Sequence, residues 1–466
     1  MKIETNTMTL SDYLEHEFTC DCGKTHSTKL EDVEIGKDAL NALPHYLNKF
    51  HLKYPYVVCD AITHGIAGQR VMDILKANQF EAYEHVFHTK RFIPDEKAIG
   101  ELLVDLVKCD VIIAIGTGSI NDLVRFFSFK LDKPFITIAT AAPMDGFASS
   151  VAALIINNFK TTYETQVPKL IIGDTEILKN APISMITAGV GDILGKFTCL
   201  CDWKLSERIN HESYCPTIGN MVYKSIQEVY AHAQKVKERD SHAIGKVMEA
   251  LVLTGVAMSF AGNSRPAAGS EHHLSHYWEM LHAEQGLPPA LHGAQVGVGT
   301  IIIIKIAELL AKIPVDFAAA REKARRYDET RWTEDIRRVY GLAAEGIIAL
   351  EKESQKNNTE KMLKRLDVIE ANWPEIKAIL KDNLPPAEEI KSTLKNLDAP
   401  YLPAQIRVDD QALRNAVIYA KETRARYTIL QLVWDLGLSE YMADQIAAYV
   451  QAEQEPNNAG LAAAAR

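Results

Sequence analysis

Three histidines and one aspartate have the residue types and the spacing of a metal site. His272 and His276 are four residues apart in the segment GSEHHLSHYWEMLH, which places them on one face of a predicted helix, and His292 follows in LHGAQVG. Upstream, Asp192 lies in GVGDILGK, on a predicted helix flanked by glycines. A carboxylate and two imidazoles leave coordination positions open, which is typical of a catalytic rather than a structural metal.

The histidines also have a plainer interpretation. A single histidine on a helix is usually a core residue whose hydrogen bonds are satisfied. Here, however, five of the fifteen histidines of the chain fall between His272 and His292. Such clustering in a segment rich in small residues favours metal or proton chemistry.

A rival group of potential ligands lies near the N-terminus, where Cys20, Cys22 and His26 have a compact spacing. The sequence offers no second cysteine pair to complete a tetrahedral site, and C-x-C is not the common zinc knuckle. We interpret this group as structural or incidental. Cys199 and Cys201 lie two residues apart on a predicted helix and so point in different directions, which favours core thiols.

A glycine-rich turn, Gly116 to Asp122 (GTGSIND), follows the predicted strand DVIIAIG and leads into a predicted helix. Its glycines let backbone amides approach a pyrophosphate, and the helix N-terminus adds partial positive charge. Because Asn121 replaces the third glycine of G-x-G-x-x-G, a tight structural turn explains this segment equally well. Asp60, at the end of an earlier predicted strand, could bind a ribose or cap a helix.

A second loop, Thr140 to Ser149 (TAAPMDGFAS), follows the next predicted strand. Thr140, Asp145 and Ser149 offer hydroxyl and carboxylate groups where the nicotinamide end of a cofactor would meet a substrate. A Pro-x-Asp-Gly turn accounts for the same residues without a ligand. The position of the loop after a strand favours function.

Strands and helices alternate from Tyr54 to Asp174, which predicts a largely parallel, Rossmann-like sheet with helices on both faces. Ligands bind at the carboxyl edge of such sheets. Residues 151–165 carry a hairpin signal at Asn157-Asn158. From there on, apolar residues recur at helical spacing. We therefore predict an α/β domain at 1–178, an all-helical domain at 179–450 and a loose tail at 451–466.

The length of 466 residues favours two domains, and the net charge of −10, spread along the chain, makes nucleic acid an unexpected partner. Seven cysteines without regular spacing and no apparent signal peptide predict a cytoplasmic protein. The longest apolar run, Val296 to Ile304, is shorter than the roughly 20 residues of a membrane span.

The motifs GTGSIND, TAAPMDGFASS, GVGDILGK, GSEHHLSH and LHGAQVG, in this order, resemble those of the sn-glycerol-1-phosphate dehydrogenases, in particular the bacterial branch. That family lies within the superfamily of iron-containing alcohol dehydrogenases and dehydroquinate synthases. The resemblance runs from about Cys20 to past Ile304. It implies the two-domain dehydroquinate synthase-like fold and the reversible reduction of dihydroxyacetone phosphate to sn-glycerol 1-phosphate, a step in phospholipid metabolism. It also implies NAD(H) or NADP(H) and one divalent metal, zinc or nickel.

Carried over by motif, the resemblance assigns the metal to Asp192, His272 and His292, and the substrate to Asp145, Asp192 and His276, with Asp192 and His276 as catalytic residues. It assigns the dinucleotide to Asp60, Gly118, Ser119, Ile120, Asn121, Asp122, Thr140, Ala141, Ala142, Pro143 and Ser149. The chain beyond about Asp398 matches no motif of the family.

The metal would act as a Lewis acid on the ketone, and His276, or water held by it, would relay the proton. Arg265 and Lys196 are the candidate phosphate-binding cations, and surface salt bridges explain either of them equally well. On the same scaffold, a glycerol dehydrogenase or a dehydroquinate synthase-like cyclase remains open, although the cyclase normally has Glu where this chain has Asp192. A silent metal- or nucleotide-binding module is the alternative without catalysis. We expect a homodimer.

Overall fold

The computed structural model describes residues 10–15, 17–89, 92–156 and 159–464. The chain divides into two compact units, each built from two stretches of sequence. Unit 1 comprises Met1–Ile193 and Cys215–Ser264, and unit 2 comprises Leu194–Tyr214 and Arg265–Arg466.

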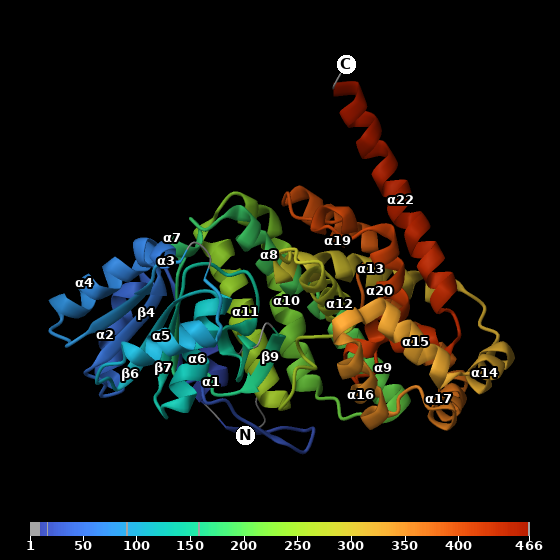
Figure 1. Ribbon diagram of the computed structural model, residues 1–466, viewed down its shortest axis with the longest axis horizontal. Coiled ribbons are helices and arrows are strands. Elements are labelled where there is room, and N and C mark those ends of the chain that lie inside the picture. Colours follow the sequence, from blue (N-terminus) through green and yellow to red (C-terminus); the bar gives the residue numbers. More distant parts are fainter. Residues whose placement is uncertain (1–9, 16, 90–91, 157–158, 465–466) are drawn as a thin grey trace. The chain divides into compact units, whose positions relative to one another are not determined.

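Unit 1 is built on a six-stranded parallel sheet, as the alternation of strands and helices predicted (Figure 1). In spatial order its strands are β3 (Asp32–Gly36), β10 (Leu170–Asp174), β7 (Phe135–Ala139), β6 (Val111–Gly116), β4 (Pro55–Asp60) and β5 (Tyr83–Phe87). The edge strand β3 was not predicted, because the alternating charged residues in DVEIG give no continuous apolar run.

The sheet is buried on both faces because successive side chains of each strand point to opposite sides. On β4, Val57 and Cys59 join one core with α2 (Leu43–Lys49) and α4 (Gln69–Ala77). Tyr56 and Val58 join the other core with α5 (Glu96–Val104) and α6 (Gly118–Lys130). This explains the near-continuous apolar runs from which the strands were predicted.

The predicted hairpin is confirmed as the antiparallel pair β8 (Val151–Ile156) and β9 (Phe159–Glu164). Its expected Asn157-Asn158 turn lies outside the described residues. A second, smaller hairpin pairs β1 (Phe18–Thr19) with β2 (Thr25–His26), after the short helix α1 (Leu10–Glu15).

The division between the units differs from the boundary that we expected after residue 178. Unit 1 also takes in α8 (Ile183–Leu194) up to Ile193, together with α10 (Pro216–Lys237) and α11 (Ser241–Ala261). Helix α11 is buried on nearly every side and packs against α7 (Thr175–Leu178) and β3. Helical periodicity identifies such a helix but does not say against which core it packs.

Unit 2 is helical throughout its described residues. It begins with α9 (Lys196–Asn210), α12 (Ser270–Glu284) and α13 (His292–Lys312), which share one apolar core around the fully buried Trp278. The remaining helices are α14 (Phe317–Arg325), α15 (Glu329–Tyr340), α16 (Ala344–Ser354), α17 (Thr359–Ala371), α18 (Trp373–Asp382), α19 (Ala387–Asn396), α20 (Asp410–Tyr419), α21 (Ile429–Asp435) and α22 (Ser439–Ala464).

The C-terminal segment differs from the loose tail that we expected at residues 451–466. Helix α22 continues to Ala464 (Figure 1). Its last residues are rich in alanine, the strongest helix former, and extending an existing helix avoids the cost of nucleating a new one.

By length and composition, three helical segments are apolar enough to cross a membrane: Ile183–Asn210, Ser241–Ala261 and His292–Lys312. In the most apolar window of each, 78–83% of the residues are buried inside the protein. Their apolar character is therefore already used in packing.

Candidate metal and nucleotide sites

The three histidines predicted for the metal and the substrate come together in unit 2. His272 and His276 lie one turn apart on α12, and His292 is the first residue of α13. The ring centres of His272 and His292 are 5.1 Å apart, and that of His276 is 6.1 Å from each. A close helix pair thus brings together residues that are twenty positions apart.

Two carboxylates orient the predicted ligands. Glu271 accepts a hydrogen bond from Nδ1 of His272 at 2.7 Å, and Glu279 accepts one from Nδ1 of His292 at 3.0 Å. Because a carboxylate can only accept, both imidazoles carry their proton on Nδ1 and leave Nε2 with a lone pair. Metal-binding histidines have this arrangement almost always.

The carboxylate of Glu271 is itself fixed below the histidines. It is fully buried and accepts hydrogen bonds from the Gly269 amide at 2.7 Å and from the Thr198 hydroxyl at 2.5 Å. Burial raises the pKa of Glu271, against these hydrogen bonds and the positive charge of Lys196. His272 is therefore held in place by a network of buried hydrogen bonds and not by apolar packing alone.

His276 differs from the other two histidines in its surroundings. Its Nδ1 lies 3.6 Å from Glu279, which is already hydrogen-bonded to His292. Burial lowers the pKa of the His276 imidazole, although Glu279 acts in the opposite direction. The neutral form is thus favoured, and a neutral imidazole can accept a proton.

In unit 1, Asp192 and the loop Thr140–Ser149 are in direct contact. Asp192 is fully buried on α8, and its carboxylate accepts a hydrogen bond from the Asp145 amide at 2.9 Å. Gly189, one turn earlier, permits this approach, because a Cβ atom there would lie 2.0 Å from the carbonyl oxygen of Ala142. Gly189 therefore serves the close packing of helix and loop.

The glycine-rich turn is where the sequence placed it, between β6 and the N-terminus of α6. No side chain caps this helix end at Thr117. A Cβ atom at Gly116 would lie 3.0 Å from Ile120, and one at Gly118 would lie 2.8 Å from the Met144 side chain. The two glycines therefore permit the close packing of this turn against Ile120 and Met144.

Several residues predicted for the dinucleotide have structural partners in unit 1. Asp60 caps the helix that follows β4 by accepting a hydrogen bond from the Thr63 amide at 2.8 Å. Asn121 accepts one from the Thr137 hydroxyl at 2.7 Å, and Asp122 pairs with the buried Arg125 at 2.7 Å. Ser149 accepts one from the Val151 amide at 3.1 Å. These contacts hold the loops in place at the carboxyl edge of the sheet.

Of the two candidate phosphate-binding cations, Arg265 is bound to a carboxylate. It makes paired hydrogen bonds to Glu212 at 2.7 and 2.5 Å and donates to the Tyr427 carbonyl oxygen at 2.9 Å. Arg265 therefore has a structural role inside unit 2. Lys196 is fully buried, and its positive charge acts to lower the pKa of Glu271, against the effect of burial.

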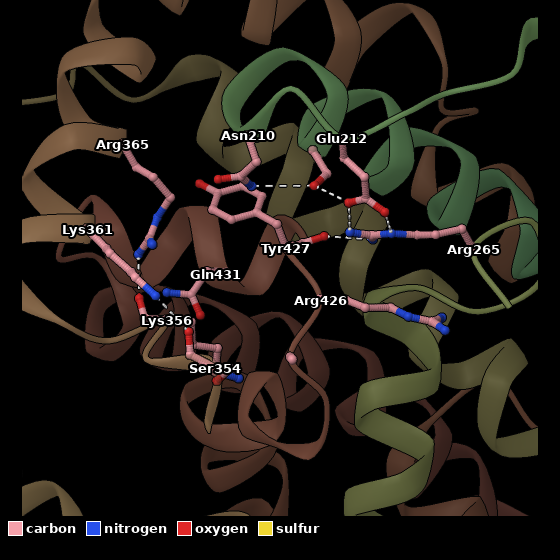
Figure 2. Close-up of a pocket in the computed structure, with 12 residues that line it drawn as sticks. Asn210, Glu212, Arg265, Ser354, Lys356, Lys361, Arg365, Arg426, Tyr427 and Gln431 are labelled. Atoms are coloured by element: carbon pink, nitrogen blue, oxygen red, sulfur yellow. Dashed lines mark hydrogen bonds and ion pairs between the residues drawn. The ribbon is translucent and has the colours of Figure 1, made fainter. Parts of the chain in front are cut away.

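Arg265 lines a basic cavity of about 390 Å³ in unit 2 (Figure 2). Its other cations are also engaged: Arg365 pairs with Asp435 at 2.7 Å, and Lys356 pairs with Glu422 at 2.9 Å. Burial and the positive charge of the neighbouring Arg265 lower the pKa of another cation in this cavity, Arg426, to about 10. None of the residues that we predicted for the metal or the cofactor lines this cavity.

The rival N-terminal group has a fourth member that the sequence analysis missed. Cys215, at the start of α10, joins Cys20, Cys22 and His26 within unit 1, and the potential ligand atoms of all four lie within 4.8 Å of one another. Cys215 is 195 residues from Cys20, so no local spacing indicated it. Glu271 and Glu279 were also missed, although they flank the histidines in the same motif.

Residues 34–182 match the family described as iron-containing alcohol dehydrogenase. The chain is 39% identical over 289 residues to the glycerol-1-phosphate dehydrogenase [NAD(P)+] of Halalkalibacterium halodurans, which covers 61% of this chain and 72% of that protein. It is 35% identical to that of Bacillus velezensis, over 67% of this chain and 82% of the relative. The chain belongs to the glycerol-1-phosphate dehydrogenase family. With the Geobacillus thermodenitrificans member it shares 30% identity over 89% of this chain and 95% of the relative.

Solved structures place this member of the glycerol-1-phosphate dehydrogenase family in the predicted fold. A glycerol dehydrogenase from Schizosaccharomyces pombe superposes with a TM-score of 0.59 at 15% identity, over 90% of this chain and 91% of that chain. An iron-containing alcohol dehydrogenase from Thermococcus thioreducens gives 0.59 at 16% identity, over 91% and 99%. The prediction of a parallel α/β region followed by a helical region is confirmed.

Proposed function

We propose that this chain catalyses the reversible, NAD(P)H-dependent reduction of dihydroxyacetone phosphate to sn-glycerol 1-phosphate with the help of one divalent metal. Family membership supports the reaction. The observation that carries the metal is the pair of imidazoles on α12 and α13, each anchored through Nδ1 by a carboxylate.

The proposed metal ligands are Asp192, His272 and His292, each of which can offer one ligand atom. One carboxylate oxygen and two imidazole nitrogens suit zinc or nickel and leave coordination positions for a substrate. When bound, the metal would supply Lewis-acid polarisation of the substrate carbonyl. Glu271 and Glu279 would act as positioning residues that hold the imidazoles in one tautomer.

The proposed dinucleotide site is the carboxyl edge of the sheet in unit 1. The amides at the start of α6, from Gly118 to Asp122, would hold the pyrophosphate, and Asp60 after β4 would bind the ribose while it caps its helix. Thr140 to Pro143 and Ser149 would line the nicotinamide end. When bound, the cofactor would supply the hydride.

The remaining roles concern the substrate. The Asp145 carboxylate would bind a substrate hydroxyl. The hydrogen bond from the Asp145 amide to Asp192 holds its loop against α8. His276, whose Nδ1 has the more distant contact to Glu279, would orient the substrate and pass a proton. Its position beside His272 and His292 supports this role.

An assay with two substrates and two metals tests this proposal. We expect NADH oxidation with dihydroxyacetone phosphate, dependent on added zinc or nickel and much slower with dihydroxyacetone. Faster turnover of the unphosphorylated ketone would instead support a glycerol dehydrogenase. No turnover of either ketone by metal-loaded protein would support a silent binding module.

We also propose that the protein works in the cytoplasm as a homodimer on a small phosphorylated substrate. The cysteines support the compartment, because the seven that the structure describes are all free thiols, as expected in a reducing environment. Light scattering on the metal-loaded protein tests the subunit number.

A further inference from the structure

Three cysteines and one histidine in unit 1 form a compact cluster that includes none of the residues assigned to catalysis. Cys20 and Cys22 lie in the connection between β1 and β2, and His26 ends β2. The connection is tight: the Gly23 amide donates to the Cys20 carbonyl at 2.9 Å, and Gly23 has a φ of +81°. A glycine adopts this conformation without strain. The turn therefore brings two thiols and an imidazole together within seven residues.

The fourth member, Cys215, arrives from the other stretch of unit 1. It is the residue before the first turn of α10, and its Sγ lies 3.6 Å from Sγ of Cys20 and 3.5 Å from Nε2 of His26. Sγ of Cys22 lies 3.3 Å from the same Nε2.

These separations are those of a tetrahedral zinc site. Zinc binds thiolate sulfur at about 2.3 Å and imidazole nitrogen at about 2.0–2.1 Å. Tetrahedral angles then place two sulfurs about 3.7 Å apart and a sulfur and a nitrogen about 3.5 Å apart. A disulfide, in contrast, requires two sulfurs at about 2.05 Å and leaves the imidazole without a role.

The histidine is already oriented as a ligand. Nδ1 of His26 lies 2.9 Å from the Phe260 carbonyl oxygen. Since a carbonyl oxygen only accepts, Nδ1 carries the proton and Nε2 faces the sulfurs with its lone pair. The ring is 1% exposed and packs between Phe18 and Phe260. The Thr217 hydroxyl oxygen accepts a hydrogen bond from the Cys20 thiol at 3.3 Å, and the same hydroxyl group would donate its proton to a thiolate there.

We propose that Cys20, Cys22, His26 and Cys215 bind one structural zinc ion that is separate from the catalytic metal. Three thiols would lose their protons on binding, and no oxidation takes place. Four protein ligands fill a tetrahedral coordination sphere, so this ion has no open position for a substrate.

The zinc ion would stabilise the small N-terminal hairpin of β1 and β2. Strands β1 and β2 have two residues each, and a pair this short is not stable by itself. The zinc ion would tie the hairpin to the start of α10, and His26 would tie it to the end of α11 through Phe260. Because Cys22 is partly exposed, a zinc ion could reach the site from solvent through this ligand.

Cobalt substitution in the His292→Ala variant tests the proposal without interference from the catalytic site. After replacement of bound zinc by Co²⁺, we expect one equivalent per chain and a strong thiolate-to-cobalt charge-transfer absorption. The additional change Cys215→Ser should abolish this absorption and the bound equivalent. Cys109→Ser, a change at a buried cysteine outside the cluster, should leave both unchanged.

Two further measurements protect the test from a folding defect in the Cys215 variant. X-ray absorption at the zinc edge of the intact His292→Ala protein should fit three sulfurs and one nitrogen. A mercurial thiol reagent added to the same protein should release one zinc ion. A spectrum with only nitrogen and oxygen neighbours, or a disulfide between Cys20 and Cys215 in non-reduced protein, would overturn the assignment.

Discussion

The chain contains two groups of side chains that we propose to bind a metal ion, and both orient a histidine in the same way although their other ligands differ. His26 in unit 1 and His292 in unit 2 each donate from Nδ1 and present Nε2. The acceptor for His26 is a backbone carbonyl, whereas that for His292 is the carboxylate of Glu279. The other ligands proposed with His26 are thiols, whereas those proposed with His292 are one imidazole and one carboxylate.

The two proposed ligand sets suit different kinds of metal centre. Three thiolates and one imidazole would occupy all four positions of a tetrahedral zinc ion and more than neutralise its positive charge, so such an ion holds chain segments together. A set of two imidazoles and one carboxylate leaves a position open and keeps the ion electrophilic. A carboxylate behind an imidazole also raises the basicity of the ligand, which a carbonyl does less strongly.

The largest expected effect comes from removing a ligand of the open set. His292→Ala should lower kcat/KM by about 10³-fold or more, because a Lewis-acid metal contributes several kcal/mol to the transition state. The measurement is steady-state NADH oxidation together with the metal content per chain. His242→Ala, at an exposed position of α11, is the control. Full activity of the metal-free variant would show that the group around His292 is not a catalytic metal site.

The next effect concerns stability rather than turnover. Cys215→Ser should lower the free energy of unfolding by about 3 kcal/mol, the size expected for losing a cross-link that closes a long loop. The kcat of the folded fraction should change little. Urea unfolding followed by circular dichroism, with Cys109→Ser in parallel, gives the comparison. Equal stability of the two variants would show that the thiol cluster does not hold the hairpin.

A smaller effect is expected from the residue behind the ligand. Glu279→Gln should weaken metal binding about 10- to 100-fold, because the amide no longer accepts a charge-assisted hydrogen bond from His292. Competition with a chromophoric chelator measures this affinity. Glu238→Gln, at the exposed end of α10, should leave the affinity unchanged. If both variants bind the metal with the same affinity, Glu279 does not orient His292 for metal binding.

The last effect tests how the loop around Asp145 is held. Gly189→Ala should destabilise the protein by about 2 kcal/mol, because overpacking against the Ala142 backbone carbonyl lies at the upper end of the about 1–3 kcal/mol that such changes cost and the gain in helix propensity offsets about 1 kcal/mol. It should also raise the KM for NADH. Gly100→Ala on α5 meets no atom within 4 Å and should be mildly stabilising. The two urea midpoints should therefore move in opposite directions.

The sequence predicted what depends on local pattern. Buried parallel strands produce continuous apolar runs, so β4, β6, β7 and β10 were found, whereas the polar edge strand β3 was not. His272 and His276 were found because their spacing matches one turn of a helix. The glutamates that are hydrogen-bonded to His272 and His292 have no sequence pattern that distinguishes them from surface charges.

Long-range contacts account for the rest. Cys215 was missed because only the folded unit 1 brings it to Cys20. The assignment of α10 and α11 to unit 1 was missed because helical periodicity does not say against which core a helix packs. The structural partners of Arg265 and Lys196 could not be foreseen either, since a charged residue in a motif gives no sign of the carboxylate that it will meet.

The distance in sequence between Cys20 and Cys215 also sets an order of events during synthesis. All six strands of the parallel sheet, from β3 to β10, precede Cys215 in the chain. On the ribosome, the last thiol therefore emerges only after the whole sheet has been translated. Zinc capture by the complete set would then follow the finished sheet, while α10 and α11 of unit 1 are still to be made. A nascent chain that stalls earlier would hold only two thiols and one imidazole of the set.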